Sequence, residues 1–522
     1  MELDVAIMGG GLAGAALARQ LRRRLPDLSI GLFERNDDGG WKVGESSVEI
    51  ACNYFVRRLG LSTYLFQEHL PKNGLRFFFD SEARDQPIEK LGEIGGLGGM
   101  PFHPSFQLDR RRLDADLRTM NIADGVHVKS DVKVTQVRPG SGGERHAFTL
   151  DDGTEVRARW LVDASGRARL LARAQGESRR DTGHDLAAAW GRVRDFVDMD
   201  QSGTQAWRDR VRNSSRFLST NHFMYPGYWI WFIPLSRGVM SIGVVCDRAL
   251  FREEWRTVPG LLAFCREHRA PRDLLEGCTP LDAMGYGHVP YACDRFFSPD
   301  RWARVGEAGA FTDPLYSPGS DFIAIENDYT TELIAMDLAG ATQTELAERC
   351  DLYDQFVQFR FDATILLYRD LYCTLGSYEL FGLKWDFDMH CYYNLWYDAY
   401  AQDKHLEPAS VRDQLALRGP ILAQLANFSK LFRDAAAEMR ARGDYFKGNL
   451  EVYSHALRAV DFATEIGLPR PRKQILRGVS AIANRTRAGI IKLLDGQHVE
   501  VAPWPLGEYM LARDLRVAGR LE

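Results

Sequence analysis

The sequence predicts an α/β protein in which a glycine-rich N-terminal domain carries an inserted mixed sheet and a mainly helical C-terminal extension. Three observations predict this fold class. A buried strand at Leu3–Met8 runs directly into a glycine-rich turn, strand-like segments follow in the middle of the chain, and helical spacing dominates after about residue 330.

Composition excludes several classes of protein. Of the 522 residues, 45% are hydrophobic and 26% charged, with a net charge of −5, which argues against a general nucleic-acid-binding protein. No apolar run is long enough to span a bilayer, and the first strand begins without a basic leader, so we expect a cytoplasmic protein. The eight cysteines form no CxxC pair or zinc spacing, so we expect reduced thiols and no metal site.

The first element is a strand, turn and helix of the kind that binds dinucleotides. The turn Gly9–Gly14 fits GxGxxG, and its glycines permit a tight turn, close approach of a pyrophosphate and close helix packing. A second strand, Ser29–Phe33, ends at Glu34, whose carboxylate can accept hydrogen bonds from ribose hydroxyls. The candidate dinucleotide-binding residues are therefore Gly9, Gly11, Gly14 and Glu34.

Two later segments favour FAD over NAD. The strand Arg159–Asp163 and the strand that begins at Ala303 each run into a turn of small residues. Both resemble motifs of the flavoprotein monooxygenase superfamily, although Glu307 stands where that family usually has Asp. The segment Gln107–Asp114 resembles the family helix whose arginine lies near the cofactor, and Gly44–Ser46 resembles a turn that lies along the flavin. This resemblance adds Glu45, Ser46, Arg110, Asp163, Gly306, Glu307 and Asp313 to the expected FAD site.

The segment Trp229–Pro234 reads WIWFIP. Strand alternation points the side chains of Trp229 and Trp231 to one face, where they either fill a core or form the wall of a site. Together with the FAD motifs, the segment resembles the WxWxIP signature of flavin-dependent halogenases at every fixed position, Pro234 included. The resemblance extends from Met1 to about residue 330 and implies that the two indoles lie near the flavin.

The halogenase resemblance implies a lysine between the flavin and a separate substrate pocket. In the family, reduced flavin, oxygen and halide give hypohalous acid, which this lysine holds beside the substrate. The segment His69–Phe77 resembles the family segment around the lysine, which assigns the role to Lys72. An ammonium group donates to the oxygen of the oxidant, and a desolvated amine can itself be halogenated. Lys42 is the rival, but it precedes the turn along the flavin.

The segment Asp313–Gly319 departs from the family pattern at two positions. Tryptophan halogenases carry a glutamate where this chain has Tyr316, so we expect an activated substrate such as a phenol or a pyrrole. Ser317 matches the family and is a candidate for positioning the oxidant. Two consecutive backbone N–H groups hold chloride in related halogenases; they align with Pro318, which has no N–H, and with Gly319. We therefore expect bromide to be preferred, or halide use to be lost.

The C-terminal third is expected to be helical, with long amphipathic runs at Thr344–Tyr368 and Val411–Ala456. An aromatic-rich segment between them, Tyr378–Tyr397, is expected mainly to pack between helices. Part of it could instead roof an apolar substrate pocket or dock a carrier protein.

The predicted function is therefore an FAD-dependent halogenase that acts on an electron-rich aromatic, free or carrier-bound. The alternative is a monooxygenase or dehydrogenase of halogenase ancestry that no longer uses halide. No second glycine fingerprint lies between a strand and a helix, so we expect a separate reductase to supply reduced flavin. The expected domains are the FAD-binding domain at 1–175 and 286–330, the inserted sheet at 176–285 and the helical extension at 331–522.

Overall fold

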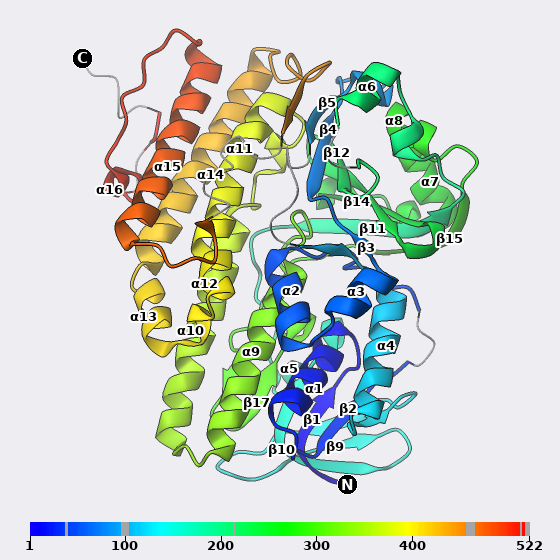
Figure 1. Cartoon of the computed structure of the whole chain (residues 1–522), viewed down its shortest axis with the longest axis vertical. Coiled ribbons are helices and arrows are strands. Elements are labelled where there is room, and N and C mark those ends of the chain that lie inside the picture. Colours follow the sequence, from blue (N-terminus) through cyan, green and yellow to red (C-terminus); the bar gives the residue numbers. More distant parts are fainter. Residues whose placement is uncertain (37–39, 96–103, 212–214, 456–464, 512–513, 517–522) are drawn as a thin grey trace.

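Three regions make up the elongated molecule in Figure 1. The glycine-rich domain lies at the bottom, a second sheet with its own helices at the upper right, and long helices form a layer on the left. The structure, a computed structural model, describes residues 1–36, 40–95, 104–211, 215–455, 465–511 and 514–516.

The first sheet places the glycine-rich turn at the carboxyl end of its central strand. Strand β1 (Glu2–Met8) lies between β2 (Ile30–Phe33) and β10 (Glu155–Asp163) and is parallel to both. Its last four residues are buried, as expected for a parallel strand covered on both faces. The two predicted N-terminal strands are thus confirmed. The remaining strands are β7 (His127–Lys129), β8 (Val134–Arg138), β9 (His146–Leu150), β16 (Phe297–Ser298) and β17 (Trp302–Arg304).

The second sheet is assembled from three parts of the chain. Among the described residues it has eight strands in the order β15-β11-β14-β13-β12-β4-β5-β18. Five of them come from the expected insertion: β11 (Leu186–Arg194), β12 (Thr220–Tyr225), β13 (Tyr228–Leu235), β14 (Val239–Asp247) and β15 (Thr279–Tyr286). The other three are β4 (Leu75–Phe79), β5 (Gly92–Gly95) and β18 (Tyr453–His455). The C-terminal extension therefore pairs with the sheet through β18.

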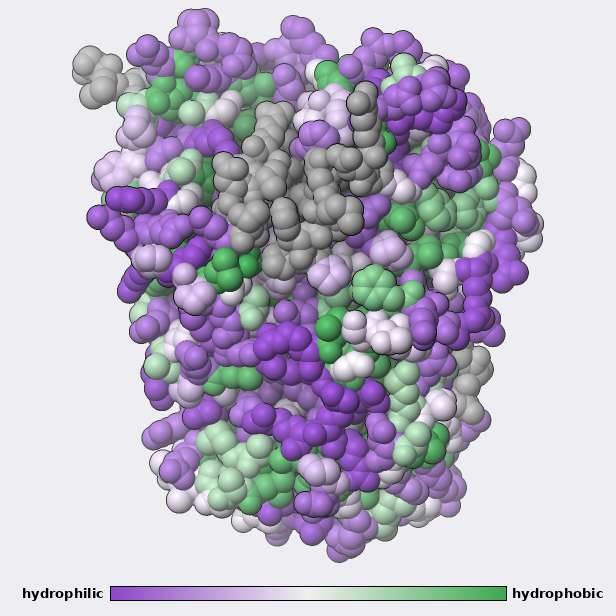
Figure 2. All heavy atoms as spheres, viewed as in Figure 1, coloured by the Kyte–Doolittle hydropathy of each residue, from purple (hydrophilic) through white to green (hydrophobic). Residues whose placement is uncertain are grey.

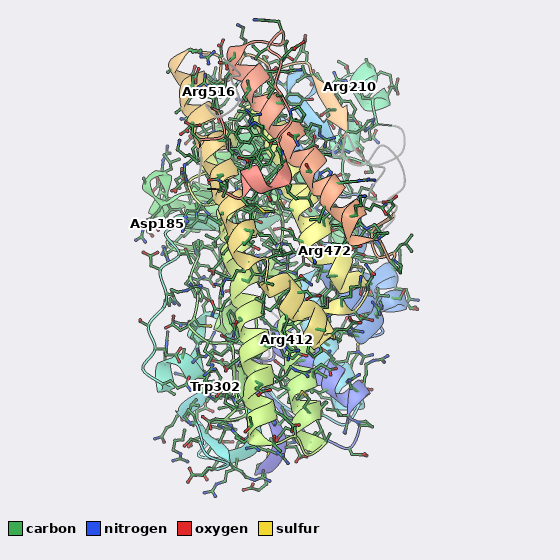
Figure 3. The ribbon with its side chains drawn as sticks, turned by 90° about the vertical axis from the view of Figure 1, so that its left-hand side faces the viewer. Asp185, Arg210, Trp302, Arg412, Arg472 and Arg516 are labelled. Atoms are coloured by element: carbon green, nitrogen blue, oxygen red, sulfur yellow. The ribbon has the colours of Figure 1, made fainter. Side chains whose placement is uncertain are left out.

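The long helices stand side by side along one side of the molecule, as Figure 3 shows. Helix α9 (Gly319–Leu338) crosses the expected boundary at residue 330, so one continuous helix joins the FAD-binding part to the extension. Helix α10 (Gln343–Leu366) matches its prediction and begins with a capping box between Thr342 and Glu345. The other long helices are α11 (Tyr378–Cys391), α14 (Arg418–Ala441) and α15 (Arg472–Asp495).

The helix expected at Val411–Ala456 is only partly confirmed. The structure has α13 (Pro408–Leu415) and α14, and then Gly443, whose φ of 71° lies in the left-handed region that ends helices. The chain then forms β18 instead of continuing as a helix; Ala456 itself lies outside the described residues.

Shorter elements complete the structure. The helices are α1 (Leu12–Arg24), α2 (Glu49–Asn53), α3 (Ser62–Glu68), α4 (Arg110–Ala123), α5 (Leu170–Ala174), α6 (Gln205–Asp209), α7 (Val258–Arg266), α8 (Arg269–Leu274), α12 (Asp398–Ala401) and α16 (Leu506–Tyr509). A two-stranded sheet pairs β3 (Leu70–Pro71) with β6 (Phe106–Gln107), and a π-helical turn, η10, spans Tyr392–Tyr397.

The face shown in Figure 2 is mostly hydrophilic, with apolar side chains in small separate patches. Within the described ranges, no helix has both the length and the apolar character needed to cross a membrane.

Candidate active site

Two cavities meet at the junction of the three regions. One, which we name the cleft, lies between the glycine-rich domain and the second sheet and is lined by Glu45, Ser46, Arg110, Trp229, Trp231, Gly306, Glu307 and the loop after β17. The other, which we name the inner pocket, lies beneath helices α10 and α11 and is lined by Lys72, Tyr316 and an aromatic roof. Lys72, which lines the inner pocket, donates a hydrogen bond to Ser46, which lines the cleft.

The glycine-rich turn has the shape required to hold a dinucleotide. Gly9 has a φ of +114°, and a Cβ there would lie 2.3 Å from the carbonyl oxygen of Ala164. A Cβ at Gly14 would lie 2.0 Å from the Gly9 carbonyl oxygen, whereas one at Gly11 would meet only Asp114, at 3.9 Å. The two tight glycines are thus required by packing, and Gly11 leaves the N-terminus of α1 open to a phosphate. Glu34 follows β2 and accepts a 2.6 Å hydrogen bond from Gly10.

The charged residues of the cleft are held by buried partners. Glu45 forms a 2.8 Å ion pair with Arg192, in which both side chains are almost fully buried, and burial raises the pKa of Glu45. Arg110 lies 2.9 Å from Asp114 on the next turn of α4. Burial likewise raises the pKa of Glu307, against the nearby charges of Arg167 and Arg110. These contacts fix the side chains that would surround FAD.

Besides the glycine turn and Glu34, two predicted FAD-site carboxylates do not line the cleft. Asp163, at the end of β10, accepts hydrogen bonds from Ser165 and from the backbone of Leu171, which shapes the turn beside Gly9. Asp313 accepts a hydrogen bond from its own loop at Leu315 N and pairs with His184 at 2.8 Å. Each carboxylate is buried and holds a loop in place.

The two tryptophans of WIWFIP lie on strand β13 and line the cleft. Their ring centroids are 5.7 Å apart, the indole N–H of Trp229 donates to Tyr372 at 2.9 Å, and that of Trp231 donates to Ser241 at 3.1 Å. The rings also pack against the hydrophobic core, so the two tryptophans both line the cleft and fill the core. Pro234 is buried near the end of the strand, away from the cavity.

Lys72 is buried in the layer between the two cavities. Its side chain is 2% exposed and lines the inner pocket, and its Nζ donates to Ser46 Oγ at 2.8 Å and to the Ser47 carbonyl at 2.7 Å. Ser46 in turn lines the cleft. Burial lowers the pKa of Lys72 to about 8, although Glu49 and Asp321 partly oppose that shift. Lys42, by contrast, is 37% exposed and pairs with Asp114 at 3.2 Å, outside both cavities.

The loop before α9 alternates between the two cavities. Tyr316 and Pro318 line the inner pocket, whereas Ser317 and Gly319 line the cleft. The alternation follows from Ser317, whose φ of 59° is in the left-handed region. Asp321 N and Phe322 N already bond to the Pro318 carbonyl, so the first free amides of α9 belong to Gly319 and to Ser320, which also lines the cleft.

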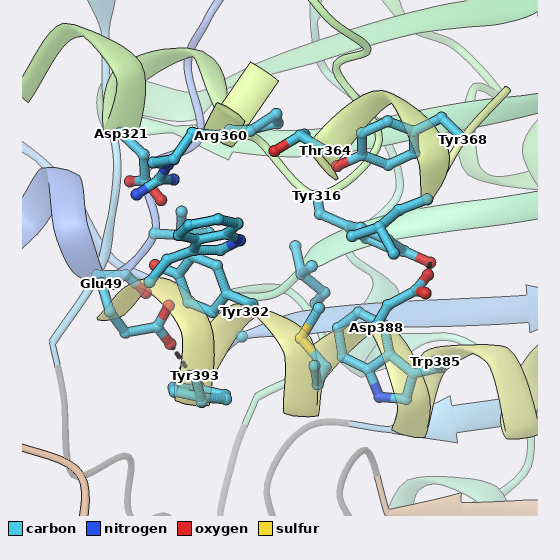
Figure 4. Close-up of a pocket in the computed structure, with 18 of the residues that line it drawn as sticks. Glu49, Tyr316, Asp321, Arg360, Thr364, Tyr368, Trp385, Asp388, Tyr392 and Tyr393 are labelled. Atoms are coloured by element: carbon cyan, nitrogen blue, oxygen red, sulfur yellow. Dashed lines mark hydrogen bonds between the residues drawn. The ribbon is translucent and has the colours of Figure 1, made fainter. Parts of the chain in front are cut away.

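Carboxylates and one arginine lie at the two ends of the inner pocket, as Figure 4 shows. At one end, Asp388 of α11 accepts a 2.9 Å hydrogen bond from the Tyr316 hydroxyl and pairs with Lys384. At the other end are Glu49, Asp321 and Arg360, from α2, α9 and α10. Tyr316 is therefore bonded to a carboxylate from another helix.

Comparison with known proteins finds relatives among the flavin-dependent halogenases. The family model described as Tryptophan halogenase matches residues 83–323. A flavin-dependent halogenase, chlA, from Dictyostelium discoideum is 29% identical over 518 residues, which covers 90% of this chain and 84% of the relative. A 1H-pyrrole-2-carbonyl-[peptidyl-carrier protein] brominase from Pseudoalteromonas luteoviolacea is 23% identical and covers 65% of this chain and 78% of the relative. The chain is similar to flavin-dependent halogenases over most of its length.

A solved structure agrees with this chain in fold. The halogenase PltM, crystallised with phloroglucinol and FAD, superposes with a TM-score of 0.66 at 15% identity, over 93% of this chain and 96% of that one. The predicted fold class and the predicted family are thus both confirmed, and FAD is the cofactor that the family name implies.

Sequence reasoning missed several charged residues of the inner pocket. It placed Lys72, Tyr316 and the aromatic segment, of which Trp385, Tyr392, Tyr393 and Trp396 line the pocket while Phe381 and Phe387 pack against other rings. It did not select Glu49, Asp321, Arg360 or Asp388. A signal was present only for Asp388, because Lys384 and Asp388 are four residues apart in a segment otherwise rich in aromatic residues.

Proposed function

We propose that this halogenase acts on an electron-rich aromatic ring in the inner pocket and that Lys72 relays the oxidised halide to it from the cleft. The observation that carries the proposal is the position of Lys72. Lys72 lines the inner pocket, and Ser46, which accepts a hydrogen bond from its ammonium group, lines the cleft. An oxidant that passes this layer meets a buried hydrogen-bond donor beside the substrate.

FAD would be held by the cleft residues Arg110 and Glu307 together with the turn Gly9–Gly14 and Glu34, which do not line the cleft. When bound and reduced, FAD supplies the oxidising equivalent from oxygen that turns halide into an electrophile. The chain itself separates the two reactants, because Trp229 and Trp231 close the cleft and the layer with Lys72 keeps the substrate ring in a different cavity. Burial of Lys72 also keeps bulk water away from the oxidant.

The halide site would lie at the N-terminus of α9. Gly319 offers a backbone N–H there, and the positive end of the helix dipole favours an anion. Pro318 offers none, so one charge-assisted donor is missing from the pair that aligns with it. Chloride is the most strongly hydrated of the candidate halides, so the missing donor should weaken its binding most. Bromide is therefore favoured.

The substrate is proposed to be a phenol or a pyrrole, free or attached to a carrier protein. The replacement of the family's glutamate by Tyr316 supports a ring that is already activated, and the names of two relatives contain phloroglucinol and a carrier-bound pyrrole. A separate flavin reductase would supply reduced FAD, because the sequence has one dinucleotide fingerprint.

Removing the Lys72 amine tests the proposal. Lys72→Ala should reduce halogenation of phloroglucinol, with reduced flavin, oxygen and bromide, by at least about 100-fold, the usual scale of a lost catalytic hydrogen-bond donor. FAD binding and oxidation of reduced flavin should persist, since Lys72 does not line the cleft. Lys42→Ala is the matched control and should stay near wild-type yield. Wild-type product from Lys72→Ala would refute the relay.

The same assay separates the alternative function. Mass spectrometry would show a bromine isotope pattern for a halogenase, an added oxygen for a monooxygenase, or lost hydrogens for a dehydrogenase. Either of the last two outcomes, with no brominated product, would replace the proposed function.

A further inference from the structure

We propose that Arg360 and Asp321 form a subsite that binds a ring hydroxyl of the substrate and removes its proton. The inference rests on the proposed function and adds to it the residues that select and activate the ring. It requires a ligand oxygen between a guanidinium and a carboxylate, at the end of the inner pocket opposite Asp388.

Arg360 is the first observation. Its side chain is 3% exposed, its Nε is buried without a hydrogen-bond partner, and among the described residues it takes part in no hydrogen bond and no ion pair. Its guanidinium lies 4.9 Å from the ring centroid of Trp396 and 5.3 Å from that of Phe322. A buried guanidinium without a partner is costly, so its five donors need an acceptor supplied by a ligand in the cavity.

Asp321 is the second, independent observation. It is fully buried, its Oδ1 accepts a 2.9 Å hydrogen bond from Ala51 N, and its Oδ2 has no partner at hydrogen-bond geometry in the described parts of the chain, although the Tyr392 hydroxyl lies near enough to lower the pKa of the carboxyl. Figure 4 shows the Asp321 and Arg360 side chains next to each other at the pocket wall. The two side chains come from α9 and α10, and neither is tied to the other by an ion pair within 4.0 Å in the described residues. A hydroxyl oxygen between them would satisfy both.

The electrostatics of this end of the pocket suit a proton acceptor. Burial raises the pKa of Asp321 to about 7, against the opposing charge of Arg360. The other groups that face it are Glu49 of α2, Tyr392 of η10 and Lys72. A carboxylate with a pKa near 7 can take a proton from a phenol whose conjugate base is held by a cation.

The proton-transfer step balances within the pocket. The O–H bond of the ring hydroxyl breaks, the proton goes to Asp321 Oδ2, and the electron pair stays on the oxygen, which Arg360 stabilises. The phenolate ring then attacks the halogen of the hypohalous acid at Lys72. The carbon–halogen bond forms as the halogen–oxygen bond breaks and hydroxide is released. The ring proton protonates that hydroxide to give water and the halogenated phenolate, and Asp321 returns its proton to the phenolate oxygen to give the halogenated phenol.

The step predicts a requirement for the free hydroxyl. The wild-type enzyme should halogenate phloroglucinol at least about 100-fold faster than 1,3,5-trimethoxybenzene, whose ring is activated but has no proton to give. Arg360→Met should lower kcat/KM for phloroglucinol by about 10- to 100-fold, the scale of one hydrogen bond to a charged group. Asp321→Asn keeps the bond to Ala51 but accepts no proton, and should lower kcat by about 100-fold.

The experiment combines these rates with a binding measurement that needs no turnover. Calorimetric titration of the FAD-loaded oxidised enzyme with phloroglucinol should give a Kd about 10- to 100-fold weaker for Arg360→Met than for wild type. Arg349→Met, which changes an arginine on the same helix outside both cavities, is the matched control and should bind like wild type.

The outcomes are distinct. Unchanged binding by Arg360→Met, failure of wild type to bind phloroglucinol, or equal rates with the trimethyl ether would overturn the subsite. If the variant binds weakly as expected but wild type forms no halogenated product, the subsite stands and the proposed halogenation of this ring fails.

Discussion

At the scale of single residues, the proposed reaction needs two groups in opposite protonation states. Lys72 must be an ammonium ion to donate to the oxidant, and burial lowers its pKa to about 8. Asp321 must be ionised to accept the hydroxyl proton, and burial raises its pKa to about 7. Both states coexist only in a narrow window around these two values.

The pH dependence of kcat/KM for phloroglucinol should therefore be bell-shaped. Activity should rise with pH through about 7 as Asp321 loses its proton, and fall through about 8 as Lys72 loses its own. Asp321→Asn should remove the rising limb and keep the falling one. The measurement is initial rate of product formation at saturating reduced flavin, and a rising limb that survives in Asp321→Asn would assign it to another group.

Pro318 offers a second test at the same scale. Its φ of −74° and ψ of −13° are accessible to any residue, so Pro318→Ala restores a backbone N–H without strain. Chloride affinity should improve by about 10- to 100-fold and bromide affinity by less, as judged from the halide concentration for half-maximal product. If wild type already uses chloride as well as bromide, the amide of Ser320 serves as the second donor and the preference is wrong.

At the scale of elements, the sequence predicted those features whose chemistry depends on local spacing. The glycine turn, the paired indoles of β13 and the Lys72 segment are each defined within a few consecutive residues. Arg360 was not predictable, because nothing in the sequence distinguishes it from Arg349 on the same helix. Only the packing of α10 over α9 and η10 leaves one of these arginines buried without a partner.

The glycine turn gives a prediction for the element that holds FAD. Gly9→Ala adds a Cβ 2.3 Å from the Ala164 carbonyl oxygen at a φ of +114°, so β1 and β10 must shift and FAD should be lost on purification. Gly478→Ala is the matched control, because that helical glycine of α15 has no atom within 4 Å of its added Cβ. It should retain FAD and gain up to about 1 kcal/mol of stability. Flavin absorbance measures the FAD content of each variant, and urea unfolding measures its stability. Full FAD content in Gly9→Ala would contradict the packing argument.

At the scale of the whole molecule, one buried carboxylate ties the FAD-binding part to the helical extension. Asp328 of α9 accepts hydrogen bonds from Gln20 at 2.6 Å, from Arg58 at 3.2 Å and from Tyr400 at 3.1 Å, and it pairs with His405 at 2.9 Å. Gln20 and Arg58 belong to the N-terminal part, whereas Tyr400 and His405 belong to the extension. These contacts of Asp328, together with the pairing of β18 with β5, predict that the FAD-binding part and the extension unfold as one cooperative unit.

Asp328→Asn tests that coupling. The substitution removes the charge from a buried network and leaves Arg58 without its buried partner, so the free energy of unfolding should fall by about 3–5 kcal/mol. Asp403→Asn is the matched control, because Asp403 contacts the same arginine at 2.6 Å but is 38% exposed, and its loss should cost at most about 1 kcal/mol.

Because hydrogen bonding and charge lower the pKa of Asp328 despite its burial, its contribution is present above the pKa of the unfolded chain and is lost as pH falls through the folded value. Flavin release and far-UV circular dichroism should shift to lower urea together; separate transitions would show that the FAD-binding part and the extension unfold independently.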